Sequence, residues 1–487
     1  MIDPTASTSG NDTRRVHAFH DDALGYDDAT AVAERIRTGE LHPLEAMQAA
    51  IDRIDSVEPA LGTLAFSDAD RALQRARAFG EHVRGPEGIP RLAGVPSAFK
   101  DNVAAAGMPT TMGSDAVRGT PADSDGPVVR ELSATGVIPV GMTTTPPFGW
   151  TAATERQGGR VTRNPWDVRR TPGGSSGGSA ALVAAGALPI AHANDGGGSV
   201  RIPAAATGLV GFKPSQGRHS HEPYSKNMPI PIVSQSVVTR SVRDTVSFWA
   251  AFESRRPATK VAPMGQIAPA PDRRLRIGMV EQSPAGGPTD AVTLTVLRLA
   301  AQRLEELGHH VDLIEAPVPS TFEDDFKAYW GLLALATSTQ GASLFGEGFD
   351  PAELDAFTVG LAAQALRRLH RIPGVLLRLN RMRRRHDAMF GDRDLILNPV
   401  VNHETPEVGY LDADQDFDQH MERVANWVTF TPAQNVAGSP AISLPAGAAP
   451  DGMPIGVQLS AHIGHDRTLL EIASEYEAAF PFARIWE

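Results

Sequence analysis

Two clusters of serine and glycine lie close together in the sequence and could support nucleophilic chemistry. The first is GGSSGGS, Gly173 to Ser179, and the second is NDGGGSVRIP, Asn194 to Pro203. A serine hydroxyl becomes a useful nucleophile when a neighbouring base removes its proton. Glycine runs lose much conformational entropy on folding, so they are usually kept where something must approach the bare backbone. The two clusters are therefore candidates for an acyl-transfer site, a phosphate site or a flexible loop.

Four short motifs suggest other phosphate or nucleophile sites in this chain, and each lacks part of the context that it needs. A P-loop needs a lysine followed by Ser or Thr after its last glycine, but Ser179 and Ala180 follow here. A dinucleotide fingerprint and a G-x-S-x-G elbow both need a preceding buried strand, whereas residues 164–172 are polar and contain two prolines. SAFK, Ser97 to Lys100, matches S-x-x-K, but the K-T-G and S-D-N elements that accompany it do not occur in the chain.

Lys100 is a candidate base. It is one of only five lysines in the chain, and it follows the apolar run GVPSAF. A lysine buried at the end of a strand has a lowered pKa and can accept a proton near neutral pH, whereas arginine stays protonated. The alternative is a lysine whose ammonium reaches solvent from the strand end.

Composition excludes several other classes of site. The chain has 487 residues, a net charge of −12 and no cysteine, so a thiol nucleophile, a disulfide and a thiolate metal site are impossible. The acidic balance argues against a nucleic-acid surface. The pairs His219/His221 and His309/His310 lack the carboxylate spacing of a metal site. We therefore expect no metal and no cofactor.

Charge and hydropathy also bear on location and partners. The polar start of the chain lacks the apolar core of a secretory signal, and no run reaches about 18 apolar residues, so we expect a cytoplasmic protein. The basic segment 367–387 is interpreted as an ion-paired surface helix, with a break at Pro373-Gly374, rather than as a nucleic-acid or membrane helix. We expect a small-molecule partner, no nucleic acid and no membrane, with a homodimer left open.

The hydrophobic pattern predicts an α/β fold. Helical spacing marks residues 28–38, 43–56, 68–82, 242–253 and 289–307, while apolar runs predict strands near 275–280, 393–399, 440–447 and 453–461. Residues 180–193 are interpreted as a buried helix followed by a strand. The proline-rich segment 257–271 is the best linker candidate. Because strands and helices still alternate beyond it, we expect one sheet rather than a separate module.

Residues Gly173 to Ala204, taken together, resemble the signature of the amidase signature family. Gly173-Gly174-Ser175-Ser176-Gly177-Gly178 precedes a helix of small residues, and Asp195, Gly197, Ser199, Arg201 and Pro203 follow at the family's spacing. GVPSAFKDNV, TRNPWD, GLVGFKPS, NVAGSPAISLPAG and GMPIGVQL are similar to further family segments. The segment AHANDGGGS is similar to the corresponding segment in the bacterial branch of the family that includes 6-aminohexanoate cyclic dimer hydrolase.

The resemblance implies a fold, an activity and a set of roles. The fold is one large α/β domain with a mixed, twisted sheet covered by helices on both faces. The activity is hydrolysis of a linear or cyclic carboxamide. Ser199 is implied as nucleophile, Ser175 as a proton relay preceded by a cis peptide, and Lys100 as base. The backbone N–H groups of Gly196, Gly197, Gly198 and Ser199 are expected to face the oxyanion. Ser176, Asp195 and Arg201 are expected to support the site.

The resemblance leaves the substrate contacts, the pocket lining and the exact reaction open. The loop GMTTTPPFG, Gly141 to Gly149, departs from the family pattern, so substrate contacts cannot be transferred there. Residues 1–25 are expected to be a flexible lead, 26–487 the amidase domain, and 255–395 its most variable part and the pocket walls. Phe322, Phe326, Tyr329 and Trp330 are candidates for the pocket lining, but core residues at helical spacing are the preferred interpretation. Esterase or carbamate hydrolysis, and an amidotransferase A-type subunit, are the alternative functions.

Overall fold

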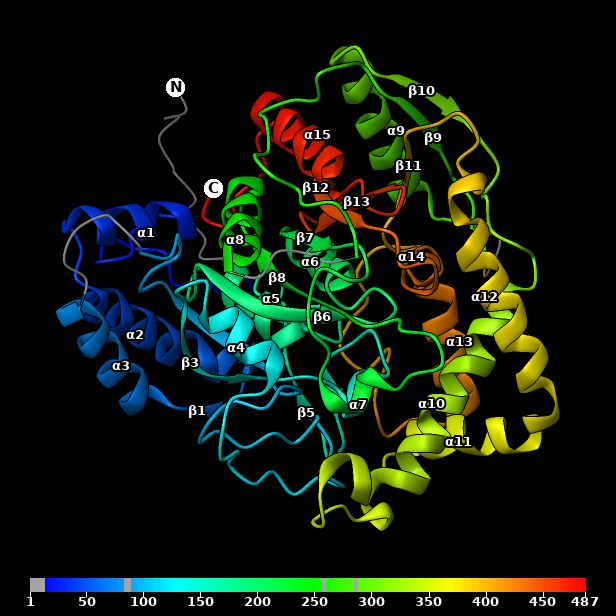
Figure 1. Ribbon diagram of the computed structural model, residues 1–487, viewed down its shortest axis with the longest axis horizontal. Helices are drawn as coiled ribbons and strands as arrows, with labels where there is room; N and C mark the ends of the chain where they lie inside the picture. Colours follow the sequence, from blue (N-terminus) through cyan, green and yellow to red (C-terminus); the bar gives the residue numbers. More distant parts are fainter. Residues whose placement is uncertain (1–13, 83–88, 256–259, 284–286) are drawn as a thin grey trace, which may run out of the picture.

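An eight-stranded mixed sheet forms the centre of the protein (Figure 1). The computed structural model describes residues 14–82, 89–255, 260–283 and 287–487. The strand order is β10 (His310–Leu313), β9 (Arg276–Met279), β11 (Leu395–Pro399), β13 (Pro454–Ala461), β12 (Ala441–Ala448), β7 (Val210–Lys213), β8 (Ser234–Thr239) and β6 (Ile190–Asp195). β9 pairs in parallel with β10 and β11, and the other neighbours pair antiparallel.

The middle of this sheet is covered on both faces. Every residue of β6, β7, β8, β11 and β13 is buried. Alternate residues of a strand point to opposite faces, so complete burial requires a covering layer on each side. The helices packed against the sheet are α5 (Gly177–Ala184), α6 (Arg201–Thr207), α8 (Val242–Arg255), α9 (Ala291–Glu306) and α15 (Asp466–Ala479). The prediction of a mixed sheet covered by helices is confirmed.

A smaller sheet carries the first candidate residue. Its order is β1 (Leu64–Ser67), β3 (Ile138–Thr143) and β2 (Pro96–Lys100), with β2 parallel to β3. The helices of this part are α1 (Ala29–Thr38), α2 (Pro43–Leu61), α3 (Ala69–His82) and α4 (Pro127–Ser133). β2 packs beside β6 of the large sheet. This contact between the two sheets brings the end of β2 toward the second glycine–serine cluster.

The predicted helix boundaries follow local sequence signals. α1 begins after Asp28, whose side chain accepts a hydrogen bond from Ala31 N–H, and it ends at Gly39 in a left-handed conformation. α2 begins at Pro43 as expected, but it continues past Ser56 to Leu61. Pro59 and the left-handed Gly62 mark its end instead.

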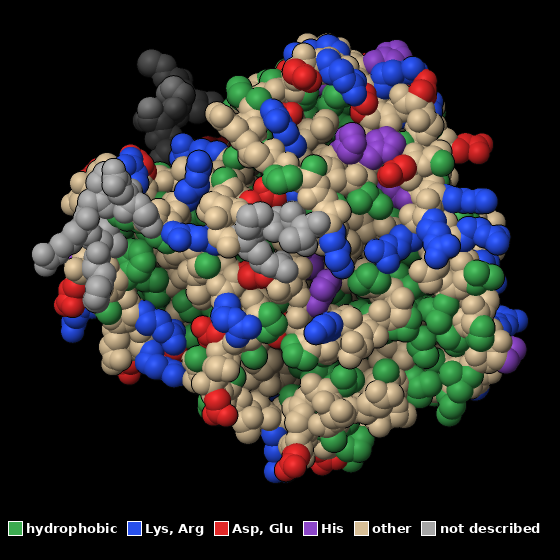
Figure 2. Space-filling model, in the orientation of Figure 1, with side chains coloured by type: hydrophobic (Ala, Val, Ile, Leu, Met, Phe, Trp, Pro, Cys, Tyr) green, Lys and Arg blue, Asp and Glu red, His purple; other side chains and the backbone are tan. Residues whose placement is uncertain are grey.

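A mainly helical region covers one side of the sheet, at the right of Figure 1. It contains α10 (Phe322–Phe345), α11 (Ala356–Arg367), α12 (Ile372–Met389), α13 (Phe417–Trp427) and α14 (Pro432–Ala437). The basic segment is interrupted just before Pro373, because α11 ends at Arg367 and α12 begins only at Ile372. Pro373 itself lies in the first turn of α12, where its missing N–H costs nothing. Arg378 of this helix pairs with Asp325 of α10. Figure 2 shows apolar side chains exposed over this region. Leu366 of α11 and Leu377 of α12 are both exposed.

Shorter elements complete the fold. They are the 3-10 helices η1 (Pro147–Gly149), η2 (Pro351–Glu353) and η3 (Leu369–Arg371), the helix α7 (Pro223–Lys226), and the two-stranded pair β4 (Glu155–Arg156) and β5 (Arg160–Val161). Among the described residues, no helix combines the length and apolarity needed to cross a membrane.

The two ends of the described chain pack against each other. Phe19 is buried, and its ring centroid lies 4.1 Å from that of Trp486. Val16 and Ala18 donate backbone hydrogen bonds to Pro165 and Ala185. Residues 1–25 were expected to form a flexible lead, but the part from residue 16 onward is packed and hydrogen-bonded to the domain. Residues 1–13 of that lead and residues 257–259 of the predicted linker lie outside the described residues.

Candidate active site

Ser199 lies in the turn between β6 and α6, directly after the three glycines. Gly198 has a φ of +130°, and a Cβ there would lie 2.2 Å from Thr431 Oγ1. This position therefore needs glycine both for its backbone conformation and for space. A Cβ on Gly197 would point at the ring of Phe326 at 3.5 Å, and one on Gly196 would point at Val233 at 3.6 Å. The run thus presents bare backbone beside Ser199.

Lys100 and Ser175 meet beside this turn. Lys100 ends β2 and is fully buried, and its Nζ lies 2.7 Å from Ser175 Oγ and 2.7 Å from Asn194 Oδ1. Ser175 precedes the N-terminus of α5, and the peptide bond between Gly174 and Ser175 is cis. The amine therefore has one hydroxyl neighbour that can carry a proton and one amide oxygen that holds it in place.

Burial changes the protonation equilibrium of Lys100. Removal from water lowers the pKa of Lys100 to about 7, and the carboxylates of Asp195 and Asp101 oppose the shift only in part. A neutral amine is present in quantity from pH 7 upward. Hydrogen bonding of one N–H to Asn194 leaves the nitrogen lone pair free to accept the Ser175 proton.

A buried ion pair fixes the geometry of the glycine turn. Asp195 accepts two hydrogen bonds of 2.8 Å from the Arg201 guanidinium. Asn435 donates to the Asp195 carbonyl and carboxylate, and Arg201 also donates to Gln458. Burial alone would raise the pKa of Asp195, but the charge and hydrogen bonds of Arg201 hold it far below its usual range. The carboxylate therefore stays ionised and keeps its donors.

Asp195 also takes up one of the expected oxyanion donors. Gly198 N–H donates to Asp195 Oδ1 at 2.7 Å, so it is not free for a ligand. The expectation that Gly198 would donate to an oxyanion is therefore wrong, while the same expectation for Gly196 and Gly197 stays a prediction. Ser176 lies behind the turn, where its hydroxyl lies 3.3 Å from Asn194 O and accepts Asn194 N–H at 3.4 Å.

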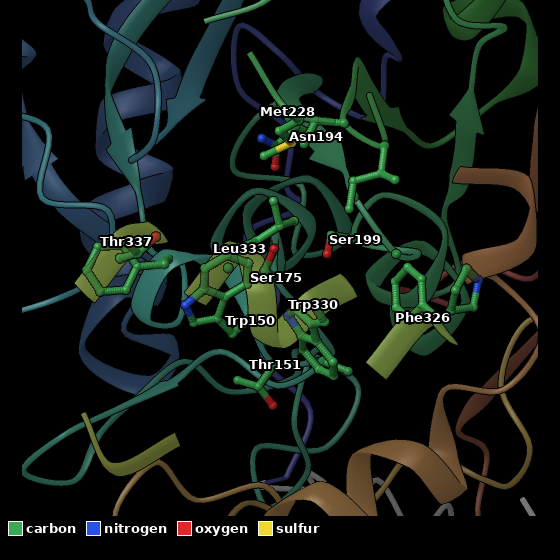
Figure 3. A pocket seen from close by; sticks show the side chains of 18 of the residues that line it. Trp150, Thr151, Ser175, Asn194, Ser199, Met228, Phe326, Trp330, Leu333 and Thr337 are labelled. Carbon is green, nitrogen blue, oxygen red and sulfur yellow. The ribbon is translucent and has the colours of Figure 1, made fainter. Parts of the chain in front are cut away.

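Lys100, Ser175 and Ser199 line one pocket, with a cavity volume of about 280 Å³. Figure 3 shows the hydroxyl oxygens of Ser175 and Ser199 in the centre of this pocket. α10 forms one wall and contributes Phe322, Phe326 and Trp330. The preferred interpretation of these side chains as core is wrong for Phe326 and Trp330, which line the pocket, whereas Phe322 lines it and is also buried in a hydrophobic cluster. Tyr329 is core instead, because its buried hydroxyl bonds both backbone groups of Ile230.

Comparison with known proteins agrees with this geometry. The Amidase family model matches residues 45–470. The chain belongs to the amidase family. The amidase-named protein AmiC of Mycobacterium tuberculosis is 46% identical over 472 residues, which cover 97% of this chain and 98% of AmiC. The similarity to AmiC thus extends over nearly the whole length of both chains. This amidase is an amide-hydrolysing enzyme.

Two further relatives support the family assignment. A 6-aminohexanoate-cyclic-dimer hydrolase of Paenarthrobacter ureafaciens is 32% identical over 94% of this chain and 95% of its own length. The solved structure of a 6-aminohexanoate cyclic dimer hydrolase with substrate superposes with a TM-score of 0.83 at 30% identity, covering 95% of this chain and 98% of that one. A bacterial aryl acylamidase superposes with a TM-score of 0.82 at 26% identity, over 94% and 97%. The resemblance to the amidase signature family is confirmed.

The structure also places the serine of the S-x-x-K motif and one of the histidine pairs. Ser97 is buried within β2 and is not among the residues that line the pocket. His309 Nδ1 accepts Leu275 N–H, and its other nitrogen faces Glu475. In the described parts of the chain, no group of three or more His, Asp or Glu side chains has the arrangement of a metal site.

In the atypical loop, Gly141 to Gly149, the last residues line the pocket and the first residues do not. Met142 and Thr144 are buried behind the site, and Thr144 Oγ1 bonds Thr162 Oγ1. Phe148 and Gly149 line the pocket, and a Cβ on Gly149 would lie 3.0 Å from Ser175 Oγ. A side chain at Gly149 would therefore press on the Ser175 hydroxyl.

Sequence reasoning missed two residues that position Lys100. Asn194 opens the quoted glycine–serine segment, but its contact with Lys100 Nζ depends on the packing of β2 beside β6. His192 Nδ1 accepts the backbone N–H of Lys100 at 3.2 Å, and its Nε2–H donates to Gln235. Burial lowers the pKa of His192 to about 4, so the ring is neutral and keeps this tautomer. The alternation of β6 is the signal that could have found both residues, because His192 and Asn194 share one face of the strand.

Proposed function

We propose that this amidase cleaves its substrate through an acyl-enzyme on Ser199, with Ser175 as proton relay and Lys100 as base. The observation that carries the proposal is the 2.7 Å contact between Lys100 Nζ and Ser175 Oγ at the wall of the pocket that Ser199 also lines. A serine needs such a base within reach. The lowered pKa of Lys100 supports the same role.

The acylation half follows from these positions. Ser199 Oγ attacks the carbonyl carbon, its proton passes to Ser175 Oγ, and the proton of Ser175 passes to the neutral amine of Lys100. The carbonyl electron pair moves to oxygen, where the N–H groups of Gly196 and Gly197 stabilise the charge. As the carbon–nitrogen bond breaks, the leaving nitrogen takes a proton from Ser175, which regains one from Lys100. The product of this half is a free amine and a Ser199 ester.

Deacylation reverses the roles of the same groups. Water attacks the ester carbon while its proton passes through Ser175 to Lys100. The carbon–oxygen bond to Ser199 then breaks, and Ser199 recovers a proton along the same path. One water is consumed, and one carboxylic acid and one amine are released for each amide.

Substitution of the nucleophile tests the proposal. Ser199→Ala should abolish turnover of a panel of amides while the melting temperature stays close to that of the parent enzyme. The matched control is Ser254→Ala, which removes an exposed hydroxyl from α8 and should keep full activity. Full activity in Ser199→Ala would refute the proposal.

The same screen separates the alternatives. Esters and carbamates need the same acyl-transfer groups, so relative kcat/KM values for matched amide, ester and carbamate decide the preferred bond. Glutamine hydrolysis that appears only with a partner chain would favour an amidotransferase subunit. A small-molecule amide is the substrate class we propose. A cytoplasmic location, independence of nucleic acid, a homodimer and the assignment of residues 255–395 to the pocket walls stay predictions.

A further inference from the structure

The pocket extends far beyond the space that a carboxamide group needs. α10 lines it from Phe322 at its first residue to Phe345 at its last. At 1.5 Å per residue these two positions are roughly 35 Å apart along the helix axis. The candidate triad lies between them, since Figure 3 shows Phe326 on one side of Ser199 and Trp150 and Thr337 on the other. The pocket is therefore a long channel with two arms.

The first arm, which we call the Phe326 arm, adjoins the glycine run. Phe326 and Val233 are the side chains that a Cβ on Gly197 or Gly196 would touch. Phe322 stacks on Phe326 with ring centroids 5.9 Å apart. A group in this arm would lie next to the backbone that we propose to bind the oxyanion.

The second arm, which we call the Phe345 arm, adjoins the relay serine. Its walls include Phe148, Trp150, Tyr224 and Phe345. Phe345 lies 5.4 Å from Phe148 and 6.5 Å from Tyr224 between ring centroids. Gly149, between Phe148 and Trp150, approaches Ser175 Oγ. This arm is aromatic and opens on the Ser175 side of the site.

Charge in the pocket is balanced. Among the described lining residues, the charged side chains other than Lys100 are Glu323 and Lys327, and these two form an ion pair one helical turn apart on α10. Neither arm therefore offers an unpaired charge to an ionised substrate. Aromatic walls without free charge favour neutral apolar groups.

Proton transfer assigns a direction to the channel. The leaving nitrogen must receive its proton from Ser175, so the amine substituent lies on the Ser175 side. The carbonyl oxygen must reach Gly196 and Gly197, so the acyl group lies on the Phe326 side. We propose that the preferred substrate is a secondary amide, with a neutral apolar acyl group in the Phe326 arm and a neutral apolar amine substituent in the Phe345 arm. This inference rests on the proposed function.

Four amides test the two arms separately. N-benzylphenylacetamide fills both arms, phenylacetamide fills the acyl arm, N-benzylacetamide fills the amine arm, and acetamide fills neither. Burial of an aromatic group should raise kcat/KM by roughly ten- to a hundredfold for each arm. A carboxylate on either ring should remove that gain. If phenylacetamide is cleaved as fast as its N-benzyl derivative, the amine arm is refuted.

Two variants assign the arms. Phe326→Ala should lower kcat/KM at least tenfold for the two phenylacetyl substrates and leave N-benzylacetamide within about threefold. Phe345→Ala should do the converse for the two N-benzyl substrates. Both rings are only partly buried, so the fold should tolerate their loss. Leu377→Ala, at a side chain on α12 that is 63% exposed, is the matched control.

Each other outcome has a definite meaning. Equal losses on all four substrates would overturn the two arms, and an exchanged pattern would overturn their assignment. If no substrate is cleaved but a serine-reactive phosphonate still labels Ser199, the substrate class is wrong and the proposed nucleophile stands. If neither cleavage nor labelling occurs, the proposed function itself fails.

Discussion

Two lysines of this amidase are buried to the same degree but differ in their surroundings. Lys100 and Lys213 are both fully buried, and burial lowers the pKa of each to about 7. Lys100 faces a serine hydroxyl and an asparagine in the pocket. Lys213, at the end of β7, donates to the carbonyls of Pro214 and Ser439 and lies 3.5 Å from Ser234 Oγ.

The comparison shows that a lowered pKa does not by itself define a base. A backbone carbonyl accepts a hydrogen bond but has no proton to donate, so it cannot relay a proton. The contacts of Lys213 with the Pro214 and Ser439 carbonyls are therefore structural. Ser175 both accepts and donates, so it connects Lys100 to the pocket. Function thus depends on the partner and on access to the cavity, in addition to burial.

Removal of each lysine gives the largest expected difference. Lys100→Met should lower kcat by about 10³-fold or more, because it removes the amine that contacts Ser175 Oγ. Lys213→Met should change kcat less than about threefold once the folded fraction is taken into account. Steady-state kinetics on one amide, with circular dichroism of both variants, makes the comparison. Equal losses of kcat in two folded variants would refute it.

The serine beside each lysine gives the next test. Ser175→Ala breaks the proton path and should lower kcat by about 10²- to 10⁴-fold. Ser234→Ala removes the hydroxyl near Lys213 and should leave kcat nearly unchanged. A substantial kcat in Ser175→Ala would mean that Lys100 reaches Ser199 by another path, for instance through water.

The pH dependence of the reaction tests the identity of the base. Lys100 must be neutral to accept a proton, so kcat/KM should rise with pH through a pKa of about 7. Asn194→Asp places a carboxylate against the amine, favours the ammonium form and should move this limb upward by about one to two pH units. Asn380→Asp on α12, outside the pocket, is the control. An unmoved limb would assign the titration to another group.

The smallest expected effect is on the pH dependence of the free energy of unfolding, and both lysines should contribute to it. Between pH 7 and the unfolded value near 10.5, the unfolded chain binds a proton at each lysine that the folded chain lacks. The free energy of unfolding should therefore rise with pH in this window, by about 1 kcal/mol per pH unit for each lysine. Denaturant unfolding of Lys100→Met and Lys213→Met should show a shallower rise than the parent.

Much of this site could be predicted because its residues belong to continuous motifs. Ser175, Ser199, Asp195 and Arg201 lie within one stretch of sequence, and the fold of that stretch is set by local glycines and two buried helices. Lys100 stood out because lysine is rare in the chain and follows an apolar run. These signals do not depend on long-range packing.

Residues from distant segments could not be found in the same way. Asn435 and Gln458 reach the Asp195–Arg201 pair only because β13 and α14 pack behind β6 and α6. Asn194 contacts Lys100 across the junction of two sheets. The prediction for Gly198 failed for a related reason, since its N–H satisfies a buried carboxylate rather than a ligand.

Covalent labelling tests the central claim most directly. The enzyme would be treated with a serine-reactive fluorophosphonate, and intact-mass measurement followed by peptide mapping would locate the adduct. The account predicts one adduct, on Ser199, with loss of amide hydrolysis in proportion to labelling and no adduct on Ser199→Ala. An adduct on Ser175 or another serine that removes activity, with Ser199 unmodified, would contradict it.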